Sequence, residues 1–356
     1  GAADPDRRGR SPHDHPPRKV IVATSIFPHY GAWNGLERRL ETLCDMIDRK
    51  VEISRETYGR GTDLILFTEH AVTGGSGTTA AEKAHPLDGK ILDTLAAKAR
   101  THNTNLCVPM HLDEDRDAGI FTNSVIILNR RGDVAGIYRK IHPVNGYACV
   151  GQDPQVLESG ITPGKTATPV ELDVGRVGVQ ICWDMCYDDG WELLAQNGAE
   201  LVLWATAAPR TLTPAMRAVQ NRYWIVTATP RDNASIFEPA TGQPLAQVHP
   251  PATMLVEQID LSWLYLFWSP DLKNGKAFTD AFGEKVGYHY IAQEDCGLFW
   301  SNDPNRTIGD MCREIGIDPD YNRVAHAGCL AENARGKPVH WHTHPACEPA
   351  PAPARA

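Results

Sequence analysis

The sequence predicts an α/β fold in which mixed β-sheets are covered by helices. Short apolar, β-branched runs alternate along the chain with segments whose apolar residues recur at helical spacing. Turn-forming residues at 129–133 and 241–242 separate strand regions and indicate hairpins, so antiparallel strands should join parallel ones in the same sheets. The length of 356 residues allows one large domain with extensions, or two domains.

The individual elements follow from these patterns in chain order. Val20–Ile26 is a β-branched run typical of a buried strand, and the apolar residues Leu36, Leu40, Leu43 and Ile47 then line one face of a helix. Further strands are expected at 64–67, 105–110, 124–128, 134–138, 176–182, 200–204, 223–228 and 253–259. Further helices are expected over 91–99, 190–198 and 214–222.

One domain, over about 19–300, fits this pattern better than two, because no linker-like composition interrupts it. Residues 1–18 are rich in proline and charge and have no apolar periodicity, which predicts a disordered leader. Residues 301–356 end in PAPAPARA and are expected to form a C-terminal extension that is partly disordered.

Composition narrows the classes of protein that need to be considered. The net charge of −9 argues against nucleic acid as a partner, and the absence of a run of about 18 apolar residues argues against a membrane span. The nine cysteines are odd in number and scattered, which indicates reduced thiols and favours a reducing cytoplasm. The polar leader and the missing initiator Met leave export after removal of a signal peptide as the alternative.

Three predicted strands each lead to one side chain that could take part in catalysis. Glu69 ends the segment DLILFTE, Lys140 lies in GIYRKIHP, and Cys182 ends the apolar part of GVQICWD. Enzymes with α/β folds place reacting groups where buried strands end. Taken singly, Glu69 also fits a solvated loop residue, Lys140 a surface lysine, and Cys182 a small core side chain.

In this order and with these flanks, the segments resemble the carbon–nitrogen hydrolase (nitrilase) superfamily, whose signature is a Glu-Lys-Cys triad. The resemblance covers about residues 19–265, and it implies a four-layer α-β-β-α sandwich that assembles as a homodimer or larger homo-oligomer. The stretches of this chain that resemble the family are 63–70, 87–98, 123–142, 158–164, 178–184, 198–201 and 218–221. The stretch 158–164 adds a fourth candidate catalytic residue, Glu158.

The resemblance implies a role for each member of the triad. Cys182 would attack a carbonyl carbon, with Glu69 as general base for the thiol and later as general acid. Lys140 would stabilise the oxyanion together with the backbone N–H of Trp183, and would favour the Cys182 thiolate. Glu158 beside Glu69 should raise a carboxyl pKa, so that the two exchange protons near neutral pH.

Two more residues, Asp184 and Trp204, are expected to contribute to substrate binding. No metal or other cofactor is expected, because every electrophilic role already has a residue, and Cys182 with Cys186 does not match a usual zinc spacing.

The leading interpretation is an amidase that releases ammonia from a small amide through a thioester. A nitrilase is the first alternative, because Cys182-Trp-Asp184 also resembles true nitrilases. An N-carbamoyl hydrolase is another, although Asp184 and Met185 stand where such enzymes carry arginines. A catalytically silent scaffold is the alternative from outside the enzyme class.

Overall fold

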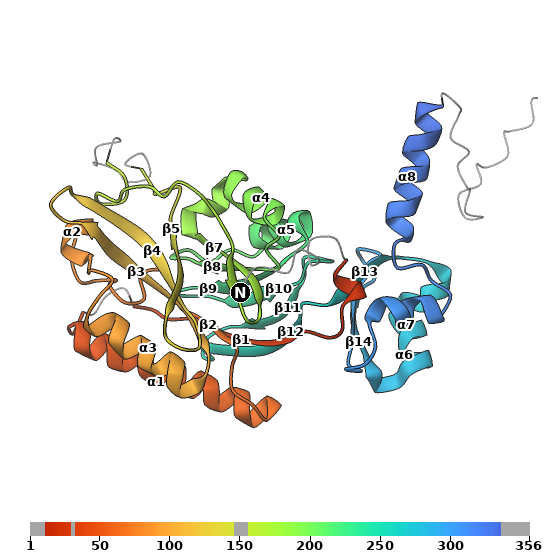
Figure 1. Cartoon of the computed structure of the whole chain (residues 1–356), viewed down its shortest axis with the longest axis horizontal. Coiled ribbons are helices and arrows are strands. Elements are labelled where there is room, and N and C mark those ends of the chain that lie inside the picture. The colour runs from red at the N-terminus through yellow and green to blue at the C-terminus, as the bar shows by residue number, and fades with distance from the viewer. Residues whose placement is uncertain (1–10, 30–32, 146–155, 336–356) are drawn as a thin grey trace, which may run out of the picture.

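The computed structural model describes residues 11–29, 33–145 and 156–335 of the chain. Two six-stranded sheets are stacked on each other, and helices cover the outer face of each (Figure 1). The predicted four-layer α-β-β-α sandwich is therefore confirmed. Among the described residues, no helix combines the length and the apolar character that crossing a membrane requires.

Both sheets are mixed, as the hairpin signals predict. In spatial order, the first sheet contains β12 (Met254–Asp260), β1 (Lys19–Ser25), β2 (Leu64–Leu66), β3 (Asn105–Asp115), β4 (Ile120–Leu128) and β5 (Val134–Arg139). The second contains β11 (Pro244–Val248), β10 (Ala234–Phe237), β9 (Trp224–Ala228), β8 (Leu201–Ala205), β7 (Gly175–Ile181) and β6 (Val170–Leu172). The central strands β1, β2 and β3 run parallel, as do β7, β8 and β9.

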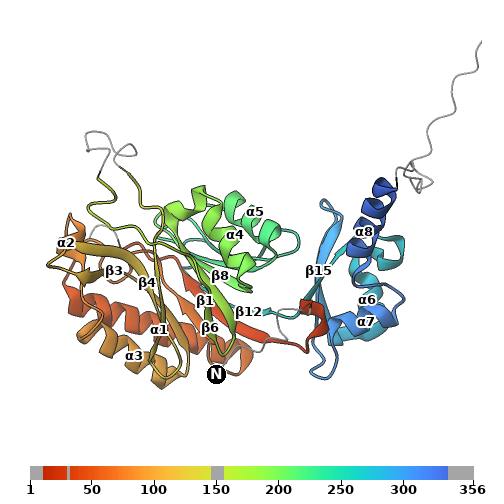
Figure 2. The same cartoon turned by 45° about the horizontal axis from the view of Figure 1, so that its top comes forward.

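The helices lie on the outer faces because the strands alternate their apolar side chains. Val20 and Val22 of β1 pack in the core with residues of the second sheet, whereas Ala23 packs beneath the helices α1 (Leu36–Tyr58) and α3 (Lys90–His102). Two helices, α4 (Asp189–Gln196) and α5 (Leu212–Asn221), cover the second sheet, as Figure 2 shows from another side.

Helix α1 is longer than the apolar periodicity predicts, because the buried residues Val51 and Ser54 continue its inner face. It ends at Gly59, whose left-handed backbone (φ 72°) donates its N–H to the carbonyl of Arg55. A short helix, α2 (Ala80–Lys83), lies beside β3 and β4 and begins with a capping box between Thr79 and Glu82.

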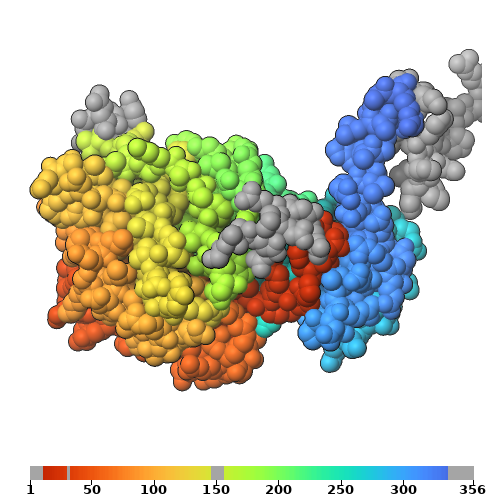
Figure 3. Space-filling view, in the orientation of Figure 1, coloured from red at the N-terminus to blue at the C-terminus, as the bar shows by residue number. Residues whose placement is uncertain are grey.

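The domain boundary expected at residue 300 falls inside a strand. A third sheet, of β13 (Trp263–Phe267), β15 (Cys296–Ser301) and β14 (Val286–Ile291), packs against α6 (Lys276–Phe282) and α7 (Ile308–Glu314). These elements share one apolar core that spans both sides of the boundary, so residue 300 cannot separate two units. The C-terminal lobe also carries α8 (Tyr321–Ala334), which projects from it (Figure 3).

Part of the expected disordered leader is also folded. Residues 12–14 form one turn of 3-10 helix, and the side chain of His13 is buried. A Cβ added to Gly309 of α7 would lie 2.8 Å from the carbonyl oxygen of His13, so the glycine allows this close contact. Residues 1–10 lie outside the described residues.

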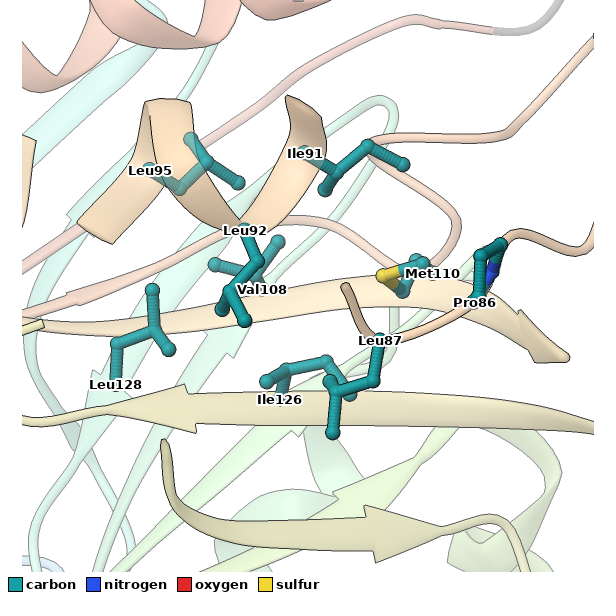
Figure 4. A pocket seen from close by; sticks show the side chains of 9 residues that line it. All are labelled: Pro86, Leu87, Ile91, Leu92, Leu95, Val108, Met110, Ile126 and Leu128. Carbon is teal, nitrogen blue, oxygen red and sulfur yellow. The ribbon is translucent and has the colours of Figure 1, made fainter. Parts of the chain in front are cut away.

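A small apolar pocket lies beneath α3, between this helix and strands β3 and β4 (Figure 4). Aliphatic side chains and one proline line it: Pro86, Leu87, Ile91, Leu92, Leu95, Val108, Met110, Ile126 and Leu128. Since none of these side chains can bind a polar group or perform acid–base chemistry, we regard this pocket as part of the core.

Candidate active site

The predicted triad residues lie at the ends of strands in the two facing sheets. Glu69 comes three residues after β2, and Lys140 directly follows β5, both in the first sheet. Cys182 directly follows β7 in the second sheet. Cys182 is close enough to the other two that the charge of each shifts the pKa of its thiol. Stacking of the sheets thus brings the three together.

Lys140 lies at the centre of a buried ion-pair network. Its Nζ is 3.0 Å from Oε1 of Glu69 and 2.7 Å from Oε2 of Glu158. The side chains of Lys140 and Glu69 are each 1% exposed. Burial alone would lower the pKa of Lys140, but the carboxylates of Glu69 and Glu158 raise it well above its usual value. The ammonium is therefore a permanent charge at neutral pH.

Burial would raise the pKa of Glu158, but Lys140 and His70 outweigh burial and hold this pKa below its usual range. The raised carboxyl pKa that was expected for the pair of glutamates is therefore wrong for Glu158. The expectation considered one carboxylate beside another and not the ammonium that lies between them.

Asn123 on β4 is a site residue to which the sequence analysis assigned no role. Its Nδ2 lies 2.8 Å from Oε1 of Glu69 and 2.7 Å from Oε1 of Glu158, and the side chain is fully buried. The amide therefore orients both carboxylates. A polar side chain within the apolar strand 120–128 was the signal that could have identified it.

Cys182 opens the 3-10 turn 182–186 and has a left-handed backbone, with φ of 42°. A strained nucleophile between a strand and a helix presents its side chain at the edge of the sheet. Burial and the charge of Glu69 raise the pKa of the thiol to about 12, although Lys140 acts in the opposite direction. The resting thiol therefore keeps its proton and needs a base, contrary to the expected thiolate.

A base lies next to this thiol. The N–H of Ala207, which follows β8, donates to Oε2 of Glu69 at 2.8 Å and lies close enough to the Cys182 thiol to lower its pKa. The carboxylate and the sulfur therefore share one neighbour. This arrangement fits Glu69 as the group that accepts the thiol proton.

Two of the residues expected to bind substrate, Trp204 and Asp184, instead form hydrogen bonds with the backbone around Cys182. Trp204 is buried, and its indole N–H donates to the backbone carbonyl of Cys182 at 3.2 Å, so it supports the nucleophile turn. The Asp184 carboxylate accepts hydrogen bonds from the Ile181 N–H (2.9 Å) and the Tyr138 hydroxyl (2.7 Å), and it is fully buried. Both residues therefore support the turn from within the protein.

Trp183 is the second residue of the 3-10 turn. Backbone N–H groups in the first turn of a helix have no acceptor within that helix. The Trp183 N–H therefore suits the oxyanion role expected for it, and this role stays a proposal.

The side chains of Glu69, His70 and Glu158 could in principle serve as metal ligands, because one ligand atom of each lies within 4.8 Å of the others. Asn123 Nδ2, however, lies within hydrogen-bonding distance of all three ligand atoms. Lys140 also pairs with both carboxylates. Since protein donors already bind both carboxylates, the donor set does not favour a cation.

Glu69, Lys140 and Cys182 thus lie together between the two stacked sheets, and this group of side chains is the candidate active site. The family model for carbon-nitrogen hydrolases matches residues 33–266, which is more than half of the chain. The protein belongs to the carbon-nitrogen hydrolase family.

Curated relatives include amidases and a nitrilase. The probable nitrilase C965.09 of Schizosaccharomyces pombe is 28% identical over 149 residues, which are 41% of this chain and 50% of that protein. Omega-amidase NIT2 of Mus musculus is 24% identical over 237 residues, which are 62% of this chain and 84% of that protein. The citrullinase of Francisella tularensis is 32% identical over 111 residues, which are 31% of this chain and 36% of that protein. The matches span half or less of the length of the first four curated relatives.

Solved structures share the fold. Nit3 of Saccharomyces cerevisiae, a member of the nitrilase superfamily, matches with a TM-score of 0.58 and 18% identity over 75% of this chain and 95% of that one. The NitFhit protein of C. elegans matches with a TM-score of 0.59 and 21% identity over 70% of this chain and 62% of that one.

Proposed function

We propose that this protein is an amidase that hydrolyses a small amide to a carboxylate and ammonia through a thioester on Cys182. One observation carries the proposal: Cys182 adjoins Glu69 and Lys140, and these two side chains are 1% exposed and joined by a hydrogen bond of 3.0 Å. Family membership and the relatives named as amidases support this reaction.

Acylation begins when Glu69 takes the proton of the Cys182 thiol. The sulfur forms a bond to the amide carbon, and the electron pair of the carbonyl moves to its oxygen, where Lys140 and the Trp183 N–H can stabilise the charge. The carbonyl then re-forms as the carbon–nitrogen bond breaks. The leaving nitrogen takes the proton from Glu69 and departs as ammonia, which leaves a thioester.

Deacylation repeats the sequence with water. Glu69 takes a proton from the water as its oxygen bonds to the thioester carbon, and the carbon–sulfur bond then breaks. The sulfur recovers the proton from Glu69, so the carboxylic acid leaves and the free thiol is restored. In this scheme Glu158 holds Lys140 in place through its ion pair and stays ionised.

The proposal includes a homodimer formed through a helical face. On α5, Leu212 is 73% exposed and Met216 is 52% exposed, and residues four positions apart lie on the same side of a helix. Such an apolar patch is typical of a protein–protein contact. Sedimentation analysis should show a dimer for the wild-type protein and a monomer for Leu212→Asp. A wild-type monomer at micromolar concentration would contradict the dimer.

We also propose a reducing cytoplasm as the location. The seven cysteines that lie in the described part of the chain are all free thiols, which supports this location. Fractionation of the native cells, with an antibody against the protein, tests it.

Ammonia release from a panel of amides, carbamoyl compounds and nitriles tests the proposed reaction. We expect turnover of an amide, loss of turnover in Cys182→Ala, and turnover close to wild type in Cys186→Ala, which changes the exposed cysteine of the same turn. Release from nitriles alone would assign the protein to the nitrilase alternative. A fully active Cys182→Ala protein would refute the mechanism, and no release from any compound would support the silent scaffold.

A further inference from the structure

His70 lies against both active-site carboxylates, although the mechanism above gives it no role. Its Nε2 is 3.6 Å from Oε1 of Glu158, 3.7 Å from Oε1 of Glu69 and 2.9 Å from Nδ2 of Asn123. The His70 side chain is 12% exposed and that of Glu158 is 14% exposed. His70 therefore lies on the outer, more accessible side of the buried pair of Glu69 and Lys140.

The number of protons around Asn123 indicates which atom of His70 carries a hydrogen. An amide nitrogen has two N–H protons, but Nδ2 of Asn123 has three neighbours within 2.9 Å. If the two carboxylates accept these protons, Nε2 of His70 receives none. The geometry favours a hydrogen on Nε2 that is directed toward Glu158, and the nearness of His70 helps to lower the pKa of that carboxyl.

Two other histidines lie close to His70, and burial disfavours the charged form of each. The ring of His111 is tilted by 30° against that of His70 with centroids 4.3 Å apart, and burial lowers the pKa of His111 well below the usual value. Burial lowers the pKa of His29, a further neighbour, to about 4. The titratable or charged groups that face His70 are Glu69, Glu158, His29, His111 and, beyond the carboxylates, Lys140.

The backbone at His70 is strained. Its φ of 61° lies in the left-handed region, which is shared by two other residues of the site, Glu158 and Cys182. Such a conformation costs about 1–3 kcal/mol for a residue other than glycine, so it persists where the surroundings enforce it, often at functional sites.

We infer that His70 is a positioning residue for the proposed hydrolysis: it directs the hydrogen on Nε2 toward Glu158 and closes the cluster in which Asn123 joins the carboxylates of Glu158 and Glu69. This inference rests on the proposed function. By fixing that cluster from its outer side, His70 keeps Glu69 oriented so that it can accept the Cys182 proton. Without the imidazole, the carboxylates lose this neighbour and Glu69 is held less firmly.

Two variants separate this role from a purely structural one. Asparagine tolerates a left-handed backbone, so His70→Asn removes the imidazole with little strain. Glycine adopts that backbone freely, so His70→Gly leaves a space that added imidazole can enter. His249→Asn, at an exposed histidine that contacts Gln247, is the matched control. If the asparagine variant does not fold, the glycine variant carries the test.

The rate at which iodoacetamide alkylates Cys182 measures transfer of the thiol proton without any substrate. We expect this rate near neutral pH to fall at least tenfold in both variants, to be unchanged in His249→Asn, and to recover with imidazole in His70→Gly. In steady-state amide hydrolysis, kcat should fall in His70→Asn with little change in KM. Wild-type alkylation rates in both variants, without rescue, would overturn the inference. An inactive wild type would refute the amidase proposal alone, because alkylation still reports on His70.

Discussion

Replacing Lys140 by methionine should destabilise the protein and inactivate it at the same time. Its Nζ lies 3.0 Å and 2.7 Å from two carboxylates, and the Lys140 side chain is only 1% exposed. With an effective dielectric constant of about 20, a pair of unit charges 3 Å apart attract by about 5–6 kcal/mol. Much of this attraction offsets desolvation of the ions, and breaking a buried pair costs about 3–5 kcal/mol net. We expect that loss for Lys140→Met at pH 8.

The loss should shrink as the pH falls. In the wild type, the lowered pKa of Glu158 contributes stability above the carboxyl's unfolded pKa, and that contribution is lost as the pH falls through the folded value. Without Lys140, burial raises this pKa, so the carboxyl can take up a proton in the folded state and relieve the unpaired charge. The destabilisation should therefore be largest at pH 8 and smaller at pH 5.

Urea unfolding of wild type and Lys140→Met at pH 8, 6.5 and 5 measures this difference. Lys90→Met, at an exposed lysine that pairs with Glu37 on the surface, should change the free energy of unfolding little at any pH. In parallel, kcat should fall by about 10²–10³ or more because an oxyanion donor is lost. A destabilisation below about 1 kcal/mol that does not vary with pH, in an active variant, would refute the reasoning.

Two further variants test the supports of the site, and a third tests Lys50, a fully buried lysine on α1. Asp184→Asn places an amide N–H donor among the groups that donate hydrogen bonds to the carboxylate. Thermal unfolding should therefore show a loss of about 2–3 kcal/mol in the free energy of unfolding, and an unchanged melting temperature would contradict this. Trp204→Phe removes the N–H that holds the Cys182 carbonyl, so steady-state kinetics should show a fall in kcat with little change in KM; an effect on KM alone would instead indicate substrate binding. Burial lowers the pKa of Lys50 to about 7, so the unfolded chain holds more protons between pH 7 and about 10.4 and stability rises with pH there. Lys50→Met should therefore stabilise more at pH 6 than at pH 9 in urea unfolding, and an equal effect at both would contradict the assignment.

Strong local patterns made the mixed sheets with covering helices predictable, and the four-layer sandwich followed from the resemblance to the family. β-branched runs such as Val20–Ile26 and the helical spacing that begins at Leu36 each specify an element without help from distant residues. The same patterns did not reveal β13, β14 and β15, because these strands have mixed compositions and are held by pairing between β13 and β15, whose residues lie far apart in sequence. Boundaries at 18 and 300 failed for the same reason: His13 and β15 gain their partners only in the folded chain.

The site was predictable where a motif carries the chemistry, and not where spatial contacts do. Glu69, Lys140 and Cys182 stand out by their flanking segments. Asn123 is marked in the sequence only as a polar side chain in an apolar strand, and no spacing reveals its contacts with the carboxylates or the contact of His70 with Glu158. Asp184 illustrates the reverse case, because its position next to the nucleophile suggests substrate binding while its hydrogen bonds give it a supporting role.

Mass spectrometry of the intact protein, quenched during turnover of an amide, tests the central claim most directly. We expect the wild-type protein to gain the mass of the acyl group, with the addition located on the peptide that contains Cys182. Cys182→Ala should gain none, and Cys186→Ala should gain as much as the wild type. An acyl group on another cysteine, or steady hydrolysis with no adduct on Cys182 even when the thioester is trapped with acid, would contradict the thioester mechanism.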